Sequence, residues 1–329
     1  MKNKIIECAK KYDADIVGFA DKSRFSPDDE IFKIFPETKT VIGLGFRVLR
    51  GIYRTAEEGT TYYQYTTMGV ENLEETVMPL ALINVSNLIE DEGFTAVPQR
   101  KNQLIVNDPN ATNPEMDYTD VVRGVTAEHQ IDFLNCAVMC GLGERSMINS
   151  LLTPEYGPFI RYCFILTDMC IEPTDLVNVG LCDRCGKCIE ACPGRAIDDD
   201  GKMDTWRCSV YYNGANGSKN PFMPPDAFLN FENRMDIING TAEFDKDEAK
   251  EILDNIYFYP PAKHYYRTSI CARACDRACY IHLEEKGVLT KKFKRKFREG
   301  EDWKLSTKQF ETLKREKEWE FTENKEKER

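Results

Sequence analysis

The sequence predicts a mixed α/β (α+β) fold followed by a cysteine-rich metal-binding region. Short apolar runs rich in β-branched residues alternate with helical patterns over the first half of the chain. From about Gly180 the pattern changes to regularly spaced cysteines, and beyond Leu289 nearly every residue is charged. The 329 residues allow two domains with proper cores. We therefore expect a first domain over 1–175, a second over 176–288 and a charged, helical tail over 289–329.

The first fifty residues predict a helix followed by two strands. Ile5, Ile6 and Ala9 form a helical apolar stripe, and residues 15–19 and 40–46 are short apolar runs typical of buried strands. Residues 52–68 are crowded with Tyr, Thr and Gly, which indicates an irregular loop.

The remainder of the first domain continues the alternation. A long helix is expected over 71–92, kinked at Pro79 and ended by Gly93. Residues 98–120 indicate a surface excursion, 128–141 a helix, 151–158 a turn and 161–167 a strand.

The second half contains one irregular and one helical stretch between its cysteines, followed by the tail. Residues 213–226 are rich in Pro, Gly and Asn, whereas 242–257 are acidic and helical in pattern. The tail begins with LysLysPheLysArgLysPheArg at 291–298. Two interpretations are open: a solvated helix, or a docking arm for an acidic partner such as a ferredoxin.

Composition narrows the function classes. The net charge of −11 argues against a general nucleic-acid binder, and no run approaches the roughly 20 apolar residues of a membrane span. The N-terminal residues have no apolar signal region, cleavage site or twin arginine, so we expect a cytoplasmic protein. Thirteen cysteines in a reducing compartment indicate metal or redox chemistry rather than disulfides.

Residues 182–193 carry the motif C-x2-C-x2-C-x3-C-P. This spacing places three thiolates on one 4Fe–4S cluster and sends the fourth to a second cluster, and thiolate is the soft anionic ligand that such clusters prefer. A zinc site uses four ligands without this continuous run and its trailing Pro193. The motif therefore predicts iron–sulfur clusters.

The other cysteines set the number of clusters. Cys208 stands alone and residues 271–279 read C-x3-C-x3-C, so eight candidate ligands are present, enough for two clusters. The alternative is that 271–279 is only a cysteine-rich helix face. The pseudo-symmetric pairing gives one cluster Cys182, Cys185, Cys188 and Cys279, and the other Cys192, Cys208, Cys271 and Cys275; which of the last group crosses over is left open. We assign no chemistry to Cys8, Cys136, Cys140, Cys163 and Cys170.

Residues 140–168 lie just ahead of the cysteine motif and begin CysGlyLeuGlyGluArgSer. This segment resembles the signature of the corrinoid-dependent reductive dehalogenases and the epoxyqueuosine reductases, which also continue into C-x2-C-x2-C-x3-C-P. The resemblance covers roughly residues 10–280 and is most specific over 140–195.

The resemblance implies a nitroreductase-like cobalamin-binding domain beside a two-cluster ferredoxin-like domain. The clusters would reduce a base-off corrinoid that reductively cleaves a small organic substrate. A low-potential donor such as ferredoxin or flavodoxin would supply the electrons, and nucleic acid is expected as a partner only if tRNA is the substrate. The chain has three histidines and no AspXaaHisXaaXaaGly motif to ligate cobalt.

Three features depart from the family patterns. Ala127 occupies the position of the aspartate proton donor of epoxyqueuosine reductases, and Glu144 that of their tryptophan. Both changes make the segment more similar to a dehalogenase, although exported dehalogenases carry a twin arginine. The last cysteine group also lacks the usual C-x2-C-x3-C spacing.

Candidate catalytic residues follow from the dehalogenase pattern, in which a tyrosine pairs with a basic residue. The resemblance places Arg161 at the family's arginine position, where it would steady a leaving group. Glu128 and His129 are candidate replacements for the missing acid. Several tyrosines could line a pocket or donate a proton: Tyr62, Tyr63, Tyr65 and Tyr118.

The turn after Cys140 is the candidate corrin contact. Its backbone and small polar groups could hold the corrin amides: Gly141, Leu142, Gly143, Ser146, Asn149 and Ser150. Two rival functions remain. One is an iron–sulfur electron carrier or activator that reduces a partner's corrinoid, and the other is a flavin-dependent reductase.

Overall fold

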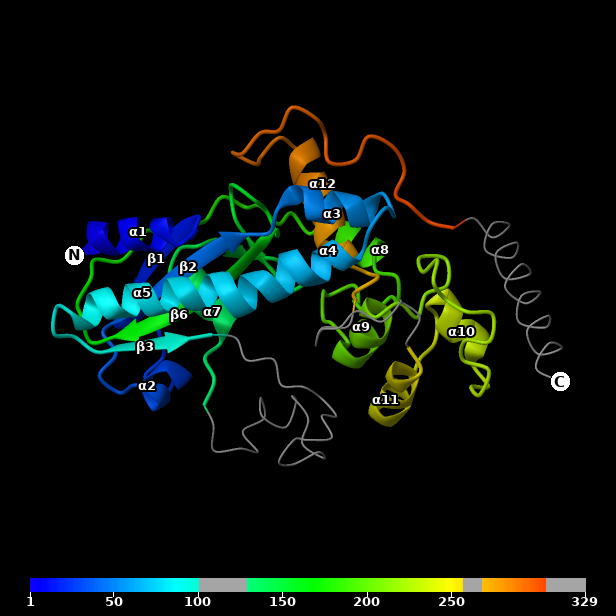
Figure 1. The fold of residues 1–329 in the computed structure, drawn as a ribbon, viewed down its shortest axis with the longest axis horizontal. Coiled ribbons are helices and arrows are strands. Elements are labelled where there is room, and N and C mark those ends of the chain that lie inside the picture. The colour runs from blue at the N-terminus through cyan, green and yellow to red at the C-terminus, as the bar shows by residue number, and fades with distance from the viewer. Residues whose placement is uncertain (101–128, 257–267, 306–329) are drawn as a thin grey trace.

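The computed structural model describes residues 1–100, 129–256 and 268–305. The sheet and the helices against it lie at the N-terminal end, and the cysteine-bearing segments lie at the other (Figure 1). Among the described residues no helix is both long and apolar enough to cross a membrane.

The N-terminal half of the chain is built on a four-stranded sheet in the order β1–β2–β6–β3. Its strands are β1 (Ile16–Asp21), β2 (Thr40–Arg47), β3 (Ala96–Gln99) and β6 (Ile160–Thr167). Every neighbouring pair is antiparallel, and Ile42 of β2 lies opposite Ile165 of β6. The expected strands over 15–19, 40–46 and 161–167 are confirmed, and the antiparallel order makes the fold α+β.

Helices cover both faces of this sheet. On one face, α1 (Lys2–Lys11) and α5 (Met78–Glu90) pack with Phe19, Ile42 and Ile165. On the other, α2 (Glu30–Ile34) and α7 (Phe133–Met139) pack with Phe164 and Leu166. A 3₁₀ turn, η1 (Lys22–Arg24), precedes α2. The strands are continuous apolar runs because both of their faces are buried.

The expected loop over 52–68 is wrong. This region forms α3 (Arg50–Glu57) and α4 (Tyr63–Thr66), followed by the π-helical turns η2 (Thr67–Glu71) and η3 (Leu73–Val77). Tyr53 and Tyr65 are buried on these helices, so the aromatic residues are core residues of short helices. Pro79 is at the start of α5, where a missing N–H is tolerated, and the long helix therefore changes type there.

Two other boundaries differ from expectation. The helix expected over 128–141 is limited to α7, which Asp132 caps through the N–H of Asn135. Residues 96–99 form the edge strand β3, where Pro98 is tolerated, and most of the expected excursion over 98–120 lies outside the described residues. The strands β4 (Glu144–Arg145) and β5 (Leu151–Leu152) pair with each other ahead of β6.

The cysteine-bearing half contains short helices joined by turns. They are α8 (Lys187–Glu190), α9 (Thr205–Tyr212), α10 (Arg234–Asn239), α11 (Lys246–Asp254) and α12 (Ala274–Glu285). Tyr211, Phe228 and Ile252 belong to its separate apolar cluster. The α11 helix lies within the stretch for which a helix was expected.

Residues 289–305, which we call the strap, run back over α3 and α12 (Figure 1). They contain no helix, and Phe297 is 1% exposed. The expected solvated helix is therefore wrong for this part of the tail, because Phe297 provides an apolar anchor. Residues 306–329 lie outside the described part of the chain.

Candidate iron–sulfur and active site

Cys182, Cys185, Cys188 and Cys279 lie together, and we call them the Cys182 group. All four line one hollow of about 20 Å³, where α8 meets α12. Burial raises the pKa of Cys279, and the negative charges of Asp276 and the three other thiols of the group add to the rise. Four thiols converging in this way form the donor set of a 4Fe–4S cluster.

Cys192, Cys208, Cys271 and Cys275 form a second set, the Cys192 group. Burial raises the pKa of Cys208 to about 12, and the nearby Cys271 and Cys192 thiols contribute. Burial also raises the pKa of Cys275, with further contributions from Asp276 and from the thiols of Cys271 and Cys208. The fold thus brings together residues that are up to 83 positions apart, from Cys192 to Cys275.

Backbone N–H groups point at several of these sulfurs. The N–H groups of Met147, Ala196 and Ala274 donate to the Sγ atoms of Cys182, Cys192 and Cys271, over 3.4, 3.3 and 3.4 Å respectively. Such bonds stabilise the thiolate form that ligates iron. The residues present therefore fit iron–sulfur clusters in both groups.

Glu144 holds the backbone segment that leads into the Cys182 group. Its carboxylate accepts hydrogen bonds from the backbone N–H groups of Val179, Gly180 and Leu181, the three residues before Cys182. A carboxylate with three N–H donors is a strong, oriented clamp. The acid that departs from the family pattern thus has a positioning role here.

The turn that carries Cys271 is held in an uncommon conformation. Ala272 and Arg273 both have positive φ angles, 42° and 50°, which non-glycine residues adopt at a cost of about 1–3 kcal/mol. Arg277 compensates by donating to the carbonyl oxygens of Cys271 and Ala272 over 2.5 and 2.7 Å. Its Nε also donates to Glu57 over 2.7 Å, which joins this turn to α3.

Beside the Cys182 group, Asp183 accepts from Lys286 and His282, both over 2.9 Å. The hydrogen bond from Lys286, followed by that from His282, holds the pKa of Asp183 well below its usual range. The Cys185 thiol lies within the same cluster of ligand atoms and is exposed, so this edge of the group faces solvent.

Arg161 lines a cavity of about 130 Å³ between the sheet and the cysteine region. Arg273 and Asp276, on either side of Cys275 in the sequence, also line the cavity, and Arg273 donates to the hydroxyl of Ser150 over 3.1 Å. The cavity is therefore adjacent to the Cys192 group. It is also lined by Tyr53, Glu74, Asn149, Tyr162 and by several apolar side chains.

The side chain of Arg161 has two partners and one open donor. Its Nη2 donates to the hydroxyl of Tyr65 over 3.1 Å, and its Nε lies 3.5 Å from Glu74 Oε1. That ion pair lacks hydrogen-bond geometry, so the buried Nε makes no hydrogen bond to any described residue. Burial raises the pKa of Tyr65, which keeps its phenol protonated at neutral pH. A guanidinium in the lining of a cavity is suited to binding an anionic or polar group.

Only some of the residues expected to contact a corrin line the Arg161 cavity. Asn149 and Ser150 line the cavity, whereas Leu142 and Ser146 are buried in the protein. A Cβ on Gly141 would lie 2.3 Å from the carbonyl oxygen of Asp175, and Gly141 has φ +72°, so this glycine permits close packing of the chain. The corrin-contact role of this turn stays a prediction.

His129 is exposed and its Nδ1 lies 2.9 Å from Glu30 Oε2 on α2, and it does not line the Arg161 cavity. The acid-replacement role expected for His129 therefore gains no support from its position. Glu128 and Tyr118 lie outside the described residues. Tyr62 packs against Trp303 of the strap, away from Arg161.

Sequence reasoning missed five polar lining residues: Tyr53, Glu74, Tyr162, Arg273 and Asp276. Two signals pointed to the last three. Tyr162 directly follows Arg161 in the segment that carries the resemblance, and Arg273 and Asp276 interleave with the last three cysteines.

The space beside Arg161 does not fit a corrinoid. A cavity of about 150 Å³ takes a benzene-sized molecule, and a corrin macrocycle is many times larger than benzene. A wider surface hollow of about 380 Å³ lies by α1 and the end of β2, but none of the eight cysteines lines it. The Arg161 cavity has the polar groups that a cofactor or substrate needs, but its volume, as the described residues line it, is too small for a corrin.

Comparison with known proteins agrees with the thiol arrangement. The family model "4Fe-4S binding domain" matches residues 176–198, the segment that contains the C-x2-C-x2-C-x3-C-P motif. The trichloroethene reductive dehalogenase of Dehalococcoides mccartyi is 36% identical over 83 residues, 23% of this chain and 15% of that protein. The epoxyqueuosine reductase of Bacillus subtilis is 28% identical over 99 residues, 30% of this chain and 24% of that protein.

A solved structure of a catabolic reductive dehalogenase covers 92% of this chain and 40% of that one, with 15% identity and a TM-score of 0.49. At this score the likeness carries no argument about chemistry. In the matched segments the chain is similar to reductive dehalogenases and to epoxyqueuosine reductases. The matched segments span less than a quarter of each of these two relatives.

Proposed function

We propose that this chain is a reductase that carries two 4Fe–4S clusters and delivers electrons to a small organic molecule beside Arg161. One observation carries the proposal: the Arg161 cavity is walled by Arg273 and Asp276, which flank a cysteine of the Cys192 group. A substrate bound in this cavity would therefore lie next to the cluster of the Cys192 group, which would donate the electrons. The named relatives, a dehalogenase and an epoxyqueuosine reductase, support the reductase class.

The two groups of cysteines give the electron count. Each cluster passes one electron at a time, so two reduced clusters supply the two electrons of a reductive cleavage. Cleaving a carbon–halogen or carbon–oxygen bond takes these two electrons and one proton, and gives a carbon–hydrogen bond and a leaving anion. The protein must therefore supply a proton donor and a cation.

The cavity residues can fill these two roles. Arg161 supplies a cation in the lining of the cavity, and this charge stabilises the leaving anion. The half-buried phenol of Tyr162 lines the cavity and is protonated at neutral pH, because burial raises its pKa. Tyr65 is a positioning residue that fixes the orientation of Arg161.

The size of the cavity favours a second candidate. Since no corrin fits beside Arg161, a corrinoid in this reaction would be held with residues outside the described ranges or by a partner protein. In the latter case the chain is an iron–sulfur activator of a partner's corrinoid. Cobalamin binding by this chain is thus a separate, testable proposal.

Anaerobic reconstitution tests the cluster assignment. We expect about eight iron atoms and eight sulfides per chain, and half of each in the Cys208→Ala variant. Retention of all iron in that variant would break the eight-ligand assignment. Uptake of cobalamin with a base-off Co(II) EPR signal would show a corrinoid on this chain, and a yellow preparation containing flavin would contradict both candidates.

Turnover tests the role of the cavity. With titanium(III) citrate as reductant and benzene-sized aryl halides as probes, we expect halide release by the holoprotein. Arg161→Leu should lower kcat/KM by at least about a hundredfold, and Arg161→Lys should recover part of the loss. Equal halide release by all variants would exclude the cavity as the reaction site.

A further inference from the structure

The strap carries an exposed basic surface on an acidic protein. Five cations within six residues are exposed: Lys291, Lys292, Lys294, Arg295 and Lys296. The chain as a whole has a net charge of −11. Such a local reversal of sign attracts a negatively charged partner to one place on the surface.

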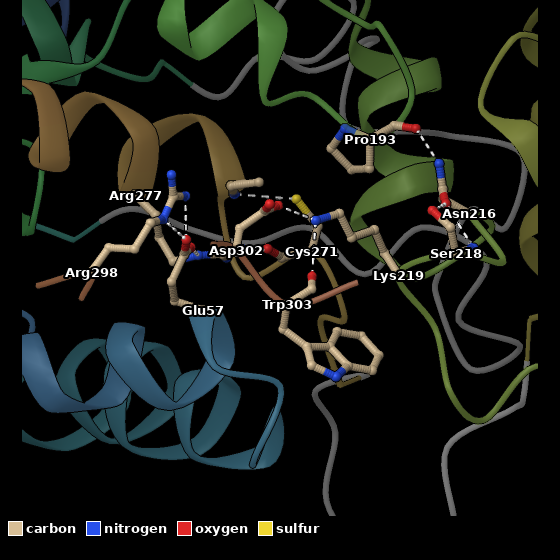
Figure 2. A network of polar contacts seen from close by, with 11 residues as sticks. Glu57, Pro193, Asn216, Ser218, Lys219, Cys271, Arg277, Arg298, Asp302 and Trp303 are labelled. Atoms are coloured by element: carbon tan, nitrogen blue, oxygen red, sulfur yellow. Dashed lines mark hydrogen bonds and ion pairs between the residues drawn. The ribbon is translucent and has the colours of Figure 1, made fainter. Parts of the chain in front are cut away.

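The strap is fixed in position, although its composition is typical of a mobile tail. Arg298 and Arg277 both bind the buried carboxylate of Glu57, and the N–H of Trp303 donates to the carbonyl oxygen of Glu57 over 3.0 Å (Figure 2). Lys219 binds Asp302 and the carbonyl oxygen of Trp303 from the cysteine-bearing half (Figure 2). The exposed cations are therefore presented by an anchored segment.

The anchored segment packs on α12, the helix that carries Cys279 of the Cys182 group. The ring of Phe297 is 5.3 Å from that of Tyr280, which follows Cys279 on α12. Lys292 donates to the carbonyl oxygen of Gly287 over 2.7 Å, one residue after Lys286. Lys286 in turn binds Asp183, beside the exposed Cys185.

We propose that the strap cations and the exposed edge at Cys185 form the docking surface for a small acidic one-electron carrier protein. This inference rests on the proposed function, because it assigns the Cys182 group as the entry cluster. The Cys192 group, next to the Arg161 cavity, is then the exit cluster. Electrons thus enter at the one exposed cysteine of the eight and leave inside the protein.

Charge complementarity and position favour an acidic redox protein over RNA. The cations are confined to one short segment, whereas an RNA backbone needs a longer basic track on a protein that otherwise repels polyanions. Phe293, 46% exposed within the cation run, provides the apolar contact typical of protein interfaces. The surface also borders the thiols that would accept the electron.

The transfer is a single-electron step. A flavodoxin hydroquinone anion is oxidised to its neutral semiquinone, and an oxidised [4Fe–4S]²⁺ cluster is reduced to [4Fe–4S]⁺. No proton or other reactant is needed at the docking surface.

Stopped-flow reduction of the reconstituted full chain by reduced flavodoxin tests the proposal. The triple variant Lys291→Glu, Lys294→Glu, Lys296→Glu should slow cluster bleaching at least about tenfold at low salt and lose its salt dependence. A matched triple variant, Lys22→Glu, Lys33→Glu, Lys39→Glu, makes the same change of charge at exposed sites by α2 and the start of β2, the opposite end of that strand from the strap contact Arg50. This variant should stay within about twofold of wild type.

Reduction by titanium(III) citrate distinguishes a defect in docking from a loss of the clusters. Equal rates for all variants with this small reductant show that the clusters are intact, so a selective loss with flavodoxin supports docking. Flavodoxin reduction of the strap variant at the wild-type rate overturns the docking surface alone. Loss of RNA stem-loop binding by that variant, with flavodoxin rates unchanged, assigns the surface to RNA. A wild-type chain that holds no clusters overturns the proposed function as well.

Discussion

The four-stranded sheet and the loops and short helices around the eight cysteines are held by different forces. Both faces of the sheet are covered by apolar side chains, such as Ile42 on one face and Phe164 on the other. Around Cys188 and Cys192 the apolar cluster has only two other buried members, Ile148 and Ile197. Hydrogen bonds and ion pairs hold the loops instead, so we expect the sheet to be stable alone and the loops to depend on bound metal.

Iron removal should give the largest difference between the two regions. Anaerobic chelation is expected to lower the amide-exchange protection of α9 and α12 by on the order of a hundredfold or more, while β2 and β6 keep theirs. Exchange measured by mass spectrometry on holo and chelated protein checks this. Uniform loss of protection would show that the sheet also depends on the clusters.

Phe164→Ala tests the other side of the comparison. Phe164 is fully buried in β6, so its truncation should lower the free energy of unfolding by about 3–5 kcal/mol. Denaturant unfolding followed by circular dichroism measures this change. The cluster absorbance of the folded variant should be unchanged at 25 °C, and an equal loss of iron would contradict independent stabilisation.

Glu57→Ala should weaken the junction between the two regions. Removing this buried carboxylate leaves Arg277 without its ion-pair partner, which should cost about 3 kcal/mol. The neighbouring Glu58→Ala is the matched control, since its ion pair with Arg54 is exposed and should contribute less than about 0.5 kcal/mol. Thermal unfolding of both variants compares them, and similar Tm values would argue against a structural role for the Glu57 network.

Glu144→Gln should have the smallest effect. The amide keeps one acceptor oxygen for the N–H groups of Val179 to Leu181 but loses the charge, so we expect a loss of about 1–2 kcal/mol. The rate of iron release from the Cys182 group, followed by absorbance under chelator, should rise. The exposed Glu172→Gln serves as the control and should release iron at the wild-type rate.

The same contrast explains what the sequence could predict. Sheet strands such as β2 and β6 are visible as local apolar runs, and the cysteine spacing carries its own chemistry. The helices α3 and α4 were missed because their tyrosines look like loop residues until Tyr53 and Tyr65 are buried against other segments. Tertiary packing, which has no local pattern, decided these elements.

The sequence predicted site residues that lie within one recognisable segment, but not the contacts between residues that are distant in the chain. Arg161 could be singled out from its segment, but its bond to Tyr65 joins residues 96 positions apart. Glu144 was visible only as a departure from a pattern, and its three N–H partners follow from the fold. The strap was expected to be solvated because one buried residue, Phe297, is hidden among charged neighbours.

The helix α8 is a single turn that contains Cys188 of one thiol group, and Cys192 of the other group follows two residues after its end. Two clusters bound as proposed would both be ligated by this short segment, which would fix the distance between them. An electron on the first cluster would then repel one arriving on the second. A redox titration would therefore show two separated waves, and Cys208→Ala would leave one wave at a potential free of this repulsion.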